Sequence, residues 1–244
     1  MNDFNRGVIG GDIDTDVGLK SFMLGTYRWM AMAMGVTAVT AYMVGQAIIA
    51  NPALLNLIYN PLTAIVSFFV IVFGFGAIGR KLPSMSMGGV LTFLFGFAAF
   101  MGVLMSAYAT AFYSPTIVAK IFFMTVAMFA ALSMFGYTTG FNLSSIIKYA
   151  VAAFLAYILI GFVGMFVPSL SVFGGGMFAT IINVIALGAI ALITAWETQT
   201  LKRIYYGTRG DVDMMNKASA FGAASLLLAF INMFTILMNL FGRE

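Results

Sequence analysis

The chain has 244 residues, of which 62% are hydrophobic and only 8% are charged, and its formal net charge is +4. An ordinary soluble domain carries about a quarter charged residues, so this composition excludes a soluble globular protein. The sequence contains neither Cys nor His, which excludes disulfides, thiolate catalysis and zinc sites built from these residues.

Residues 1–20 form the first distinct segment of the chain. They contain four Asp, together with Arg6 and Lys20, and no apolar core. A cleavable signal peptide needs such a core. We therefore expect a short polar tail on the cytoplasmic side.

Long apolar runs follow along the rest of the chain. Runs of about 20 residues match the hydrocarbon thickness of a bilayer, and they lack the alternating pattern of barrel strands. The sequence thus predicts an all-α membrane protein, a single bundle of seven transmembrane helices over residues 21–244. Pro, Asn or Gly lies at most of the breaks, as is typical of turns and helix starts. The expected spans are 27–49, 61–79, 86–109, 115–138, 146–167, 175–199 and 217–241.

Basic residues predict the orientation of these spans. Placing the tail and alternate loops on one side leaves only Arg243 on the other, plus Lys120 if its side chain reaches the outer interface. Cytoplasmic loops carry an excess of Lys and Arg, so the N-terminus is expected in the cytoplasm. The C-terminus would then lie outside, unless the last segment is re-entrant. Orientation accounts for the positive charge, and no nucleic-acid partner is expected. The ten residues on the basic side are Arg6, Lys20, Arg28, Arg80, Lys81, Lys148, Lys202, Arg203, Arg209 and Lys217.

Small residues recur within the third and fifth spans. Such residues let helix backbones approach closely in a membrane. We interpret them as packing positions rather than ligand sites. They are Gly96, Ala98, Ala99, Gly102, Gly161 and Gly164.

Two ionisable residues, Lys120 and Glu197, are predicted at or within membrane depth. Lys120 is expected about 8 Å below the outer end of its span, whereas Glu197 lies roughly 30 Å from that side at 1.5 Å per residue. An ion pair between them is therefore not expected. Lys120 is predicted to extend to the outer interface.

Glu197 has two interpretations. It is either an interfacial carboxylate, wetted from the cytoplasm and close to Lys202 or Arg203, or a group that faces the interior of the bundle. In the interior an isolated charge is costly, so the group would take up a proton more readily and could serve a proton-sensitive gate. Thr198 and Gln199 add polarity beside it.

Four stretches resemble the Bax inhibitor one family, also called YccA-like. GLKSFMLGTYRWMAMAMGVTAVTAY (18–42) is similar to its first span, and KIFFMTVAMFAALSMFGYTTGFNLSS (120–145) resembles its fourth span and a GYTTK-DLS turn. AWETQTLKRIYYG (195–207) resembles the YDTQ-x-IK signature, with Trp196 for Tyr and Glu197 for Asp. LLLAFINMFTILMNLFG (226–242) resembles the last span, which is commonly LYLDFINLFLxLL.

The resemblance places Glu197 at the first of two family carboxylates. In members of the calcium-leak type these form a proton-linked pair in the channel core. Ala229 stands where the second acid would be, so this position is lost. A single Glu cannot share a proton as a pair does, and calcium prefers six to eight oxygen ligands. Near Glu197 the further candidates for an ion pathway are Thr198, Gln199 and Asn232, besides backbone carbonyls and water. The alternative role for Asn232 is an interhelical hydrogen bond.

These observations lead to one functional expectation and one alternative. The resemblance implies a multi-pass protein of the bacterial inner membrane, embedded in lipid, that acts as a pH-sensitive cation leak for calcium or protons with one remaining carboxylate. The alternative is a non-transporting protein that regulates a membrane protease or is a subunit of a larger membrane complex. Without His or clustered carboxylates, we expect neither an enzyme nor a bound cofactor.

Overall fold

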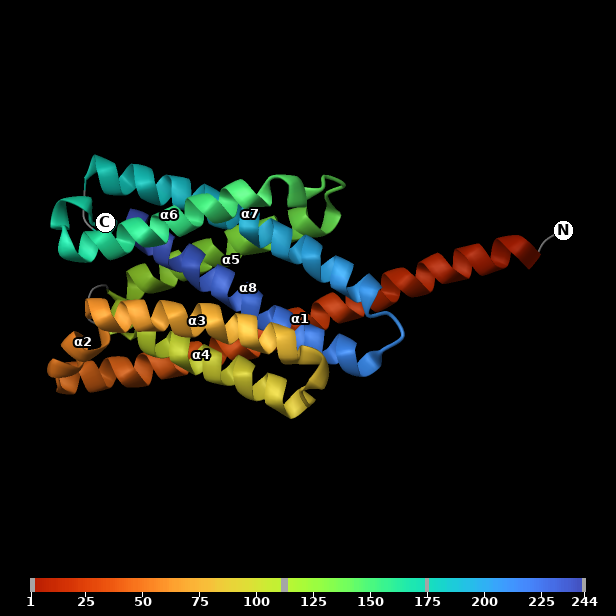
Figure 1. Ribbon diagram of the computed structural model, residues 1–244, viewed down its shortest axis with the longest axis horizontal. Coiled ribbons are helices and arrows are strands. Elements are labelled where there is room, and N and C mark those ends of the chain that lie inside the picture. The colour runs from red at the N-terminus through yellow and green to blue at the C-terminus, as the bar shows by residue number, and fades with distance from the viewer. Residues whose placement is uncertain (1–2, 111–113, 174–175, 243–244) are drawn as a thin grey trace.

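A computed structural model describes residues 3–110, 114–173 and 176–242, and every regular element in these ranges is helical (Figure 1). The long helices are α1 (Asp3–Ala50), α3 (Pro61–Lys81), α4 (Met87–Thr110), α5 (Pro115–Thr138), α6 (Ile147–Phe166), α7 (Met177–Gly207) and α8 (Val212–Phe241). The short elements are α2 (Ala53–Ile58) and three 3-10 turns, η1 (Leu82–Ser84), η2 (Leu143–Ser145) and η3 (Pro168–Leu170).

Seven helices in the described part of the chain are long and apolar enough to cross a membrane, which confirms the predicted bundle. Two of the breaks are fixed by polar residues that cap the helix that follows. The side chain of Asn60 accepts a hydrogen bond from Thr63 N at 2.9 Å, and Pro61 opens α3. Ser114 Oγ accepts from Ile117 N at 3.3 Å at the start of α5. Both are N-caps that satisfy amide groups at a helix start.

Three predicted boundaries differ from the structure. The apolar part of α1 begins at Val17 instead of residue 27, and the helix itself continues back through the expected tail to Asp3. Helix α7 continues to Gly207 and α8 begins at Val212, so the connection expected between the spans 175–199 and 217–241 shrinks to four residues. Charged residues lower the mean hydropathy at these helix ends, so the predicted spans stop short. Apolar residues between the charged ones are nevertheless buried, and their packing stabilises the additional helical turns. Phe22 of α1 packs against Tyr205 of α7 with 5.7 Å between ring centroids.

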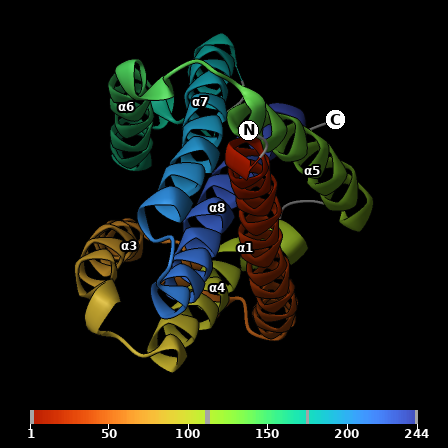
Figure 2. The ribbon, with the colours of Figure 1, turned by 90° about the vertical axis from the view of Figure 1, so that its right-hand side faces the viewer.

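Helix α8 lies at the centre of the bundle. In Figure 2 it is surrounded by α1, α4, α5 and α7, all of which contact it. In its most apolar segment 67% of residues are buried, against 6% in α3 and 11% in α6, which lie at the periphery. Helices adjacent in sequence, such as α6 with α7 and α7 with α8, are in contact, but the most extensive pairing joins α1 and α4.

Close packing of α1 and α4 depends on Gly102. A Cβ added there would lie 2.6 Å from Thr37 O and 2.7 Å from Thr40 Cβ. Thr37 Oγ1 also donates a hydrogen bond across the interface to Ala98 O at 2.9 Å. The packing role expected for small residues is therefore confirmed at Gly102. It is not found at Gly96, where nothing lies within 4 Å of an added Cβ.

One end of the bundle collects the N-terminal part of α1 and the α3–α4, α5–α6 and α7–α8 turns (Figure 1). We call it the basic end, because Arg80, Lys81, Lys148 and Arg209 lie at these turns. The sorting of charge to one end agrees with the orientation argument, while the cytoplasmic position of this end stays a prediction. Arg243 lies outside the described residues.

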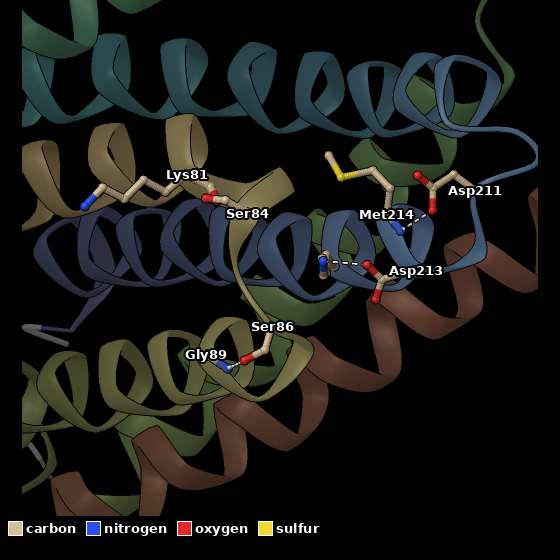
Figure 3. A network of polar contacts seen from close by, with 8 residues as sticks. Lys81, Ser84, Ser86, Gly89, Asp211, Asp213 and Met214 are labelled. Carbon is tan, nitrogen blue, oxygen red and sulfur yellow. Dashed lines mark hydrogen bonds and ion pairs between the residues drawn. The ribbon is translucent and has the colours of Figure 1, made fainter.

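Local bonds fix two turns at the basic end (Figure 3). Ser86 Oγ accepts from Gly89 N at 3.2 Å at the start of α4. Asp211 caps α8 by accepting from Met214 N at 2.9 Å, and exposed Asp213 pairs with buried Lys217 one turn later. Chain reversal between α7 and α8 also needs Gly210, whose φ of 99° is in the region that favours glycine.

Candidate functional site

Glu197 lies on α7 at the edge of the helix face that packs into the bundle. Thr194, Thr198, Leu201 and Tyr205 form the buried stripe beside it. Its carboxylate atom Oε2 is buried and accepts no hydrogen bond from the described residues. Buried polar atoms are nearly always hydrogen-bonded, so an orphaned carboxylate oxygen marks a functional candidate.

The two cations that the interfacial interpretation placed close to Glu197 bond elsewhere. Lys202 Nζ donates to Tyr137 O at 3.4 Å and lies 5.4 Å from the centroid of the Tyr137 ring. Arg203 donates to Ser144 Oγ at 2.7 Å and to Thr200 Oγ1 at 2.8 Å. The salt bridge between Lys217 and Asp213 is the only one among the described residues. Glu197 thus has no cationic partner in this part of the chain.

Lys120 is also remote from Glu197, as expected from the depth argument. An added Cβ on Gly136 of α5 would lie 2.2 Å from Ala195 O of α7, so the two helices touch at these residues. Lys120 precedes Gly136 by 16 positions on the same helix, which is about 24 Å at 1.5 Å per residue. The two ionisable groups therefore lie toward opposite ends of the bundle.

Thr198 and Gln199 occupy different faces of α7. Thr198 is fully buried, and its Oγ1 donates to Thr194 O at 3.2 Å. Gln199 instead faces the α5–α6 connection, where its Oε1 accepts from Leu143 N at 3.1 Å and its Nε2 donates to Phe141 O at 2.7 Å. The structure therefore uses Gln199 to hold a loop and leaves Thr198 beside Glu197.

Gln199 lines a pocket of about 310 Å³ at the basic end. Lys202, Arg203 and Tyr206 of α7 form one wall, and residues 139–142 form the other. Glu197 does not line this pocket, so Gln199 does not connect the carboxylate to it.

Helix α8 carries Ala229, the position that the resemblance aligned with the second family acid. Ala229 is 2% exposed and belongs to the apolar core. Gly222 of α8 meets Leu201 of α7 so closely that an added Cβ would lie 2.3 Å from Leu201 Cδ2. Counting 1.5 Å per residue from this contact along the two antiparallel helices brings Ala229 within about one helical turn of the level of Glu197. An acid at this position would therefore lie at a similar depth.

Asn232 lies one turn further along α8. It is half-buried, and its side chain makes no hydrogen bond with a described residue. Its amide oxygen could serve as a neutral ligand, but the helical rise puts it deeper in the bundle than Ala229. No group of three or more Asp or Glu side chains that could hold a metal occurs among the described residues. A calcium ion would thus meet one carboxylate and neutral oxygens.

Ser133 of α5 was not anticipated from the sequence. It is 5% exposed, and its hydroxyl has no hydrogen-bond partner in the described part of the chain. Helical Ser and Thr often donate to the carbonyl four residues earlier, as Thr125 does to Ile121 O at 2.8 Å. An isolated Ser in an apolar span was the available signal, but sequence alone does not show which hydroxyls lack this bond.

Comparison with known proteins identifies the family. A family model described as inhibitor of apoptosis-promoting Bax1 matches residues 19–244. The chain belongs to this Bax inhibitor family. An uncharacterized protein of Caulobacter vibrioides is 31% identical over 99% of this chain and 98% of the relative. The inner membrane protein YbhL of Escherichia coli is 29% identical over 93% of each chain. An uncharacterized membrane protein of Streptococcus pyogenes is 28% identical over 94% of this chain and 96% of its own.

Membership in the Bax inhibitor family agrees with the resemblance found in the sequence. Together with the seven apolar helices and the inner membrane relative, it identifies a multi-pass protein of the inner membrane. The matched range, residues 19–244, includes both Glu197 and Ala229.

Proposed function

We propose that this Bax inhibitor family protein conducts cations and that Glu197 is the proton-sensitive group of the pathway. The observation that carries the proposal is the buried Oε2 of Glu197, which has neither a hydrogen bond nor a counter-ion among the described residues. A charge in such surroundings is strongly disfavoured unless it is neutralised. Either a proton or a passing cation can neutralise it.

Competition between protons and cations follows from this arrangement. When Glu197 is protonated it is neutral and attracts no cation, whereas the ionised form favours a cation beside it. A single carboxylate gives weak binding, since calcium takes six to eight oxygen ligands and strong sites use several carboxylates. Weak binding suits a leak, because an ion must also leave the site. We infer calcium as a transported ion from the calcium-leak members that the sequence resembles.

The test measures calcium flux into proteoliposomes at two pH values, one below and one above neutral. We expect greater flux at the alkaline value in the wild type and a flux that no longer depends on pH in Glu197→Gln. Glu197→Asp, which introduces the acid typical of the family motif, should keep the pH dependence. A pH dependence preserved in Glu197→Gln would contradict the role proposed for this carboxylate.

A second candidate is a non-transporting protein that regulates a membrane protease or accompanies a larger complex. The apolar Ala229 at the place of the second acid favours it. The peripheral helices α3 and α6 also leave most of their apolar surface uncovered by this chain. Lipid or the helices of a partner could cover these faces.

Ala229→Asp distinguishes the two functions. If the chain has lost the ion pathway, the wild type should show no flux, and the new acid near the level of Glu197 should restore it. Co-purification of a partner in stoichiometric amounts from mild detergent would then support the interaction function. Flux in the wild type that requires Glu197 would favour the leak.

A further inference from the structure

A groove of about 640 Å³ runs between α1 and α5, on the surface of the bundle. It is open along one side, and Phe230 of α8 contributes to its floor. Both walls pack against α8, which holds them apart. Phe129 of α5 contacts Phe230 with 5.6 Å between ring centroids, so the floor is firmly packed.

The length of the groove matches one leaflet of a bilayer. Along α1 it extends from Lys20 to Met34, and along α5 from Tyr137 to Val126. At 1.5 Å per residue these stretches are about 21 Å and about 16 Å long. One leaflet contributes about half of the 30 Å hydrocarbon core. A chain lying in the groove would thus reach from the interface to near the midplane.

Polar groups are concentrated toward the basic end of the groove. Lys20 and Tyr137 line this part and Tyr27 lies halfway along the α1 wall, whereas Met, Leu, Val, Ala and Phe dominate the remainder. Tyr is typical of the membrane interface, and basic residues between transmembrane helices bind anionic headgroups. The residues that line the groove in the described part of the chain include no carboxylate. Its charge therefore complements an anion.

Ser133 provides an independent indication of a ligand. It lines the groove, is 5% exposed and has no hydrogen-bond partner among the described residues. It precedes Tyr137 by one helical turn, about 6 Å deeper in the membrane. An ester carbonyl of a phospholipid lies at such a depth below its headgroup and would accept the hydrogen bond that Ser133 can donate.

We propose that this groove binds an anionic phospholipid. One acyl chain lies between α1 and α5, the phosphate contacts Lys20, and a glycerol ester accepts from the Ser133 hydroxyl. The site is separate from Glu197, which does not line the groove, so the proposal does not depend on ion transport.

The experiment is native mass spectrometry of the full chain in mild detergent, with phosphatidylglycerol or phosphatidylcholine added. We expect the wild type to retain one phosphatidylglycerol in preference to phosphatidylcholine. Lys20→Gln should weaken that retention roughly fivefold, the factor expected for one Lys near an anionic headgroup. Lys148→Gln is the matched control, because Lys148 also lies at the basic end but does not line the groove.

Two pairs of variants test the acyl-chain position. Ala31→Phe and Ala130→Phe would fill the groove from either wall and should reduce retention of both lipids. Ala38→Phe and Ala131→Phe place the same side chain on exposed positions of the same helices outside the groove, and they should have no effect. All four positions are exposed in this chain, so none of these variants needs room in the core.

Ser133→Ala should lower retention of both lipids alike, since both carry the ester. Equal effects of Lys20→Gln and Lys148→Gln would overturn the headgroup assignment, and equal effects of the groove and control Phe variants would overturn the acyl-chain site. A dimer disrupted by Ala31→Phe and Ala130→Phe, with no bound lipid, would show that a second copy occupies the groove instead.

Discussion

Gly136 shows how a single hydrogen atom in place of a side chain fixes the position of α5 against α7. The nearest atoms to an added Cβ all belong to the backbone of Ala195, the closest being its carbonyl oxygen at 2.2 Å. A flexible side chain could move aside, but two packed helix backbones cannot do so locally. Ala195 is also two residues from Glu197, so this contact positions the segment that carries the carboxylate.

Gly136→Ala should therefore destabilise the bundle by about 1–3 kcal/mol, the usual cost of overpacking a core. Gly188→Ala on α7 is the control, because nothing lies within 4 Å of its added Cβ. That change should be neutral or stabilise by up to about 1 kcal/mol through helix propensity. Thermal unfolding in detergent measures both. Equal midpoints for the two variants would contradict the close contact.

At the level of elements, Tyr59 joins the α2–α3 turn to the end of α4. Its hydroxyl donates to Leu104 O at 2.5 Å and accepts from Ala107 N at 2.9 Å. Burial raises the pKa of Tyr59 from its ordinary value of 10.0, and this outweighs the hydrogen bonds from Ala107 and Ser106 that lower it. The folded state thus favours the neutral hydroxyl that can donate.

Tyr59→Phe should cost about 1 kcal/mol of stability at neutral pH, a typical value for a hydrogen-bonded group. Since the folded pKa is raised, the stabilisation is complete below the ordinary value of 10.0 and declines as pH rises through the folded pKa. The difference in unfolding midpoint between wild type and Tyr59→Phe should therefore narrow in strong alkali. A difference that widens there would contradict the assigned direction.

The sequence predicts the individual helices better than it predicts which helices pack against one another. Apolar length and turn residues were enough for seven spans, because bilayer thickness acts on each helix separately. The α1–α4 pairing depends on the meeting of Thr37 and Gly102, which is a property of two helices together. The same holds for Gln199, whose sequence position beside Glu197 suggested an ion pathway although its side chain holds the α5–α6 loop. Likewise, the motif located Glu197, but only the structure shows that Oε2 has no partner.

At the scale of the whole molecule, the charged turns gather at one end, and the excess of Lys and Arg predicts that this end is cytoplasmic. The chain has no native cysteine, so single introduced cysteines report on one position each. Lys148→Cys and Arg209→Cys should resist a membrane-impermeant maleimide in intact spheroplasts and react after lysis. Ser169→Cys, in the connection at the other end, should react before lysis. The reverse pattern would invert the topology.

The central position of α8 bears on how the protein is made. Six membrane helices precede α8 in the sequence, so they leave the ribosome before the helix around which four of them pack. Until α8 is synthesised, the inward faces of α1, α4, α5 and α7 must be covered by lipid, by one another or by the insertion machinery. The helices therefore cannot adopt their final packing one at a time in the order in which they are translated. The final packing of the bundle forms only after its central helix, α8, has been synthesised.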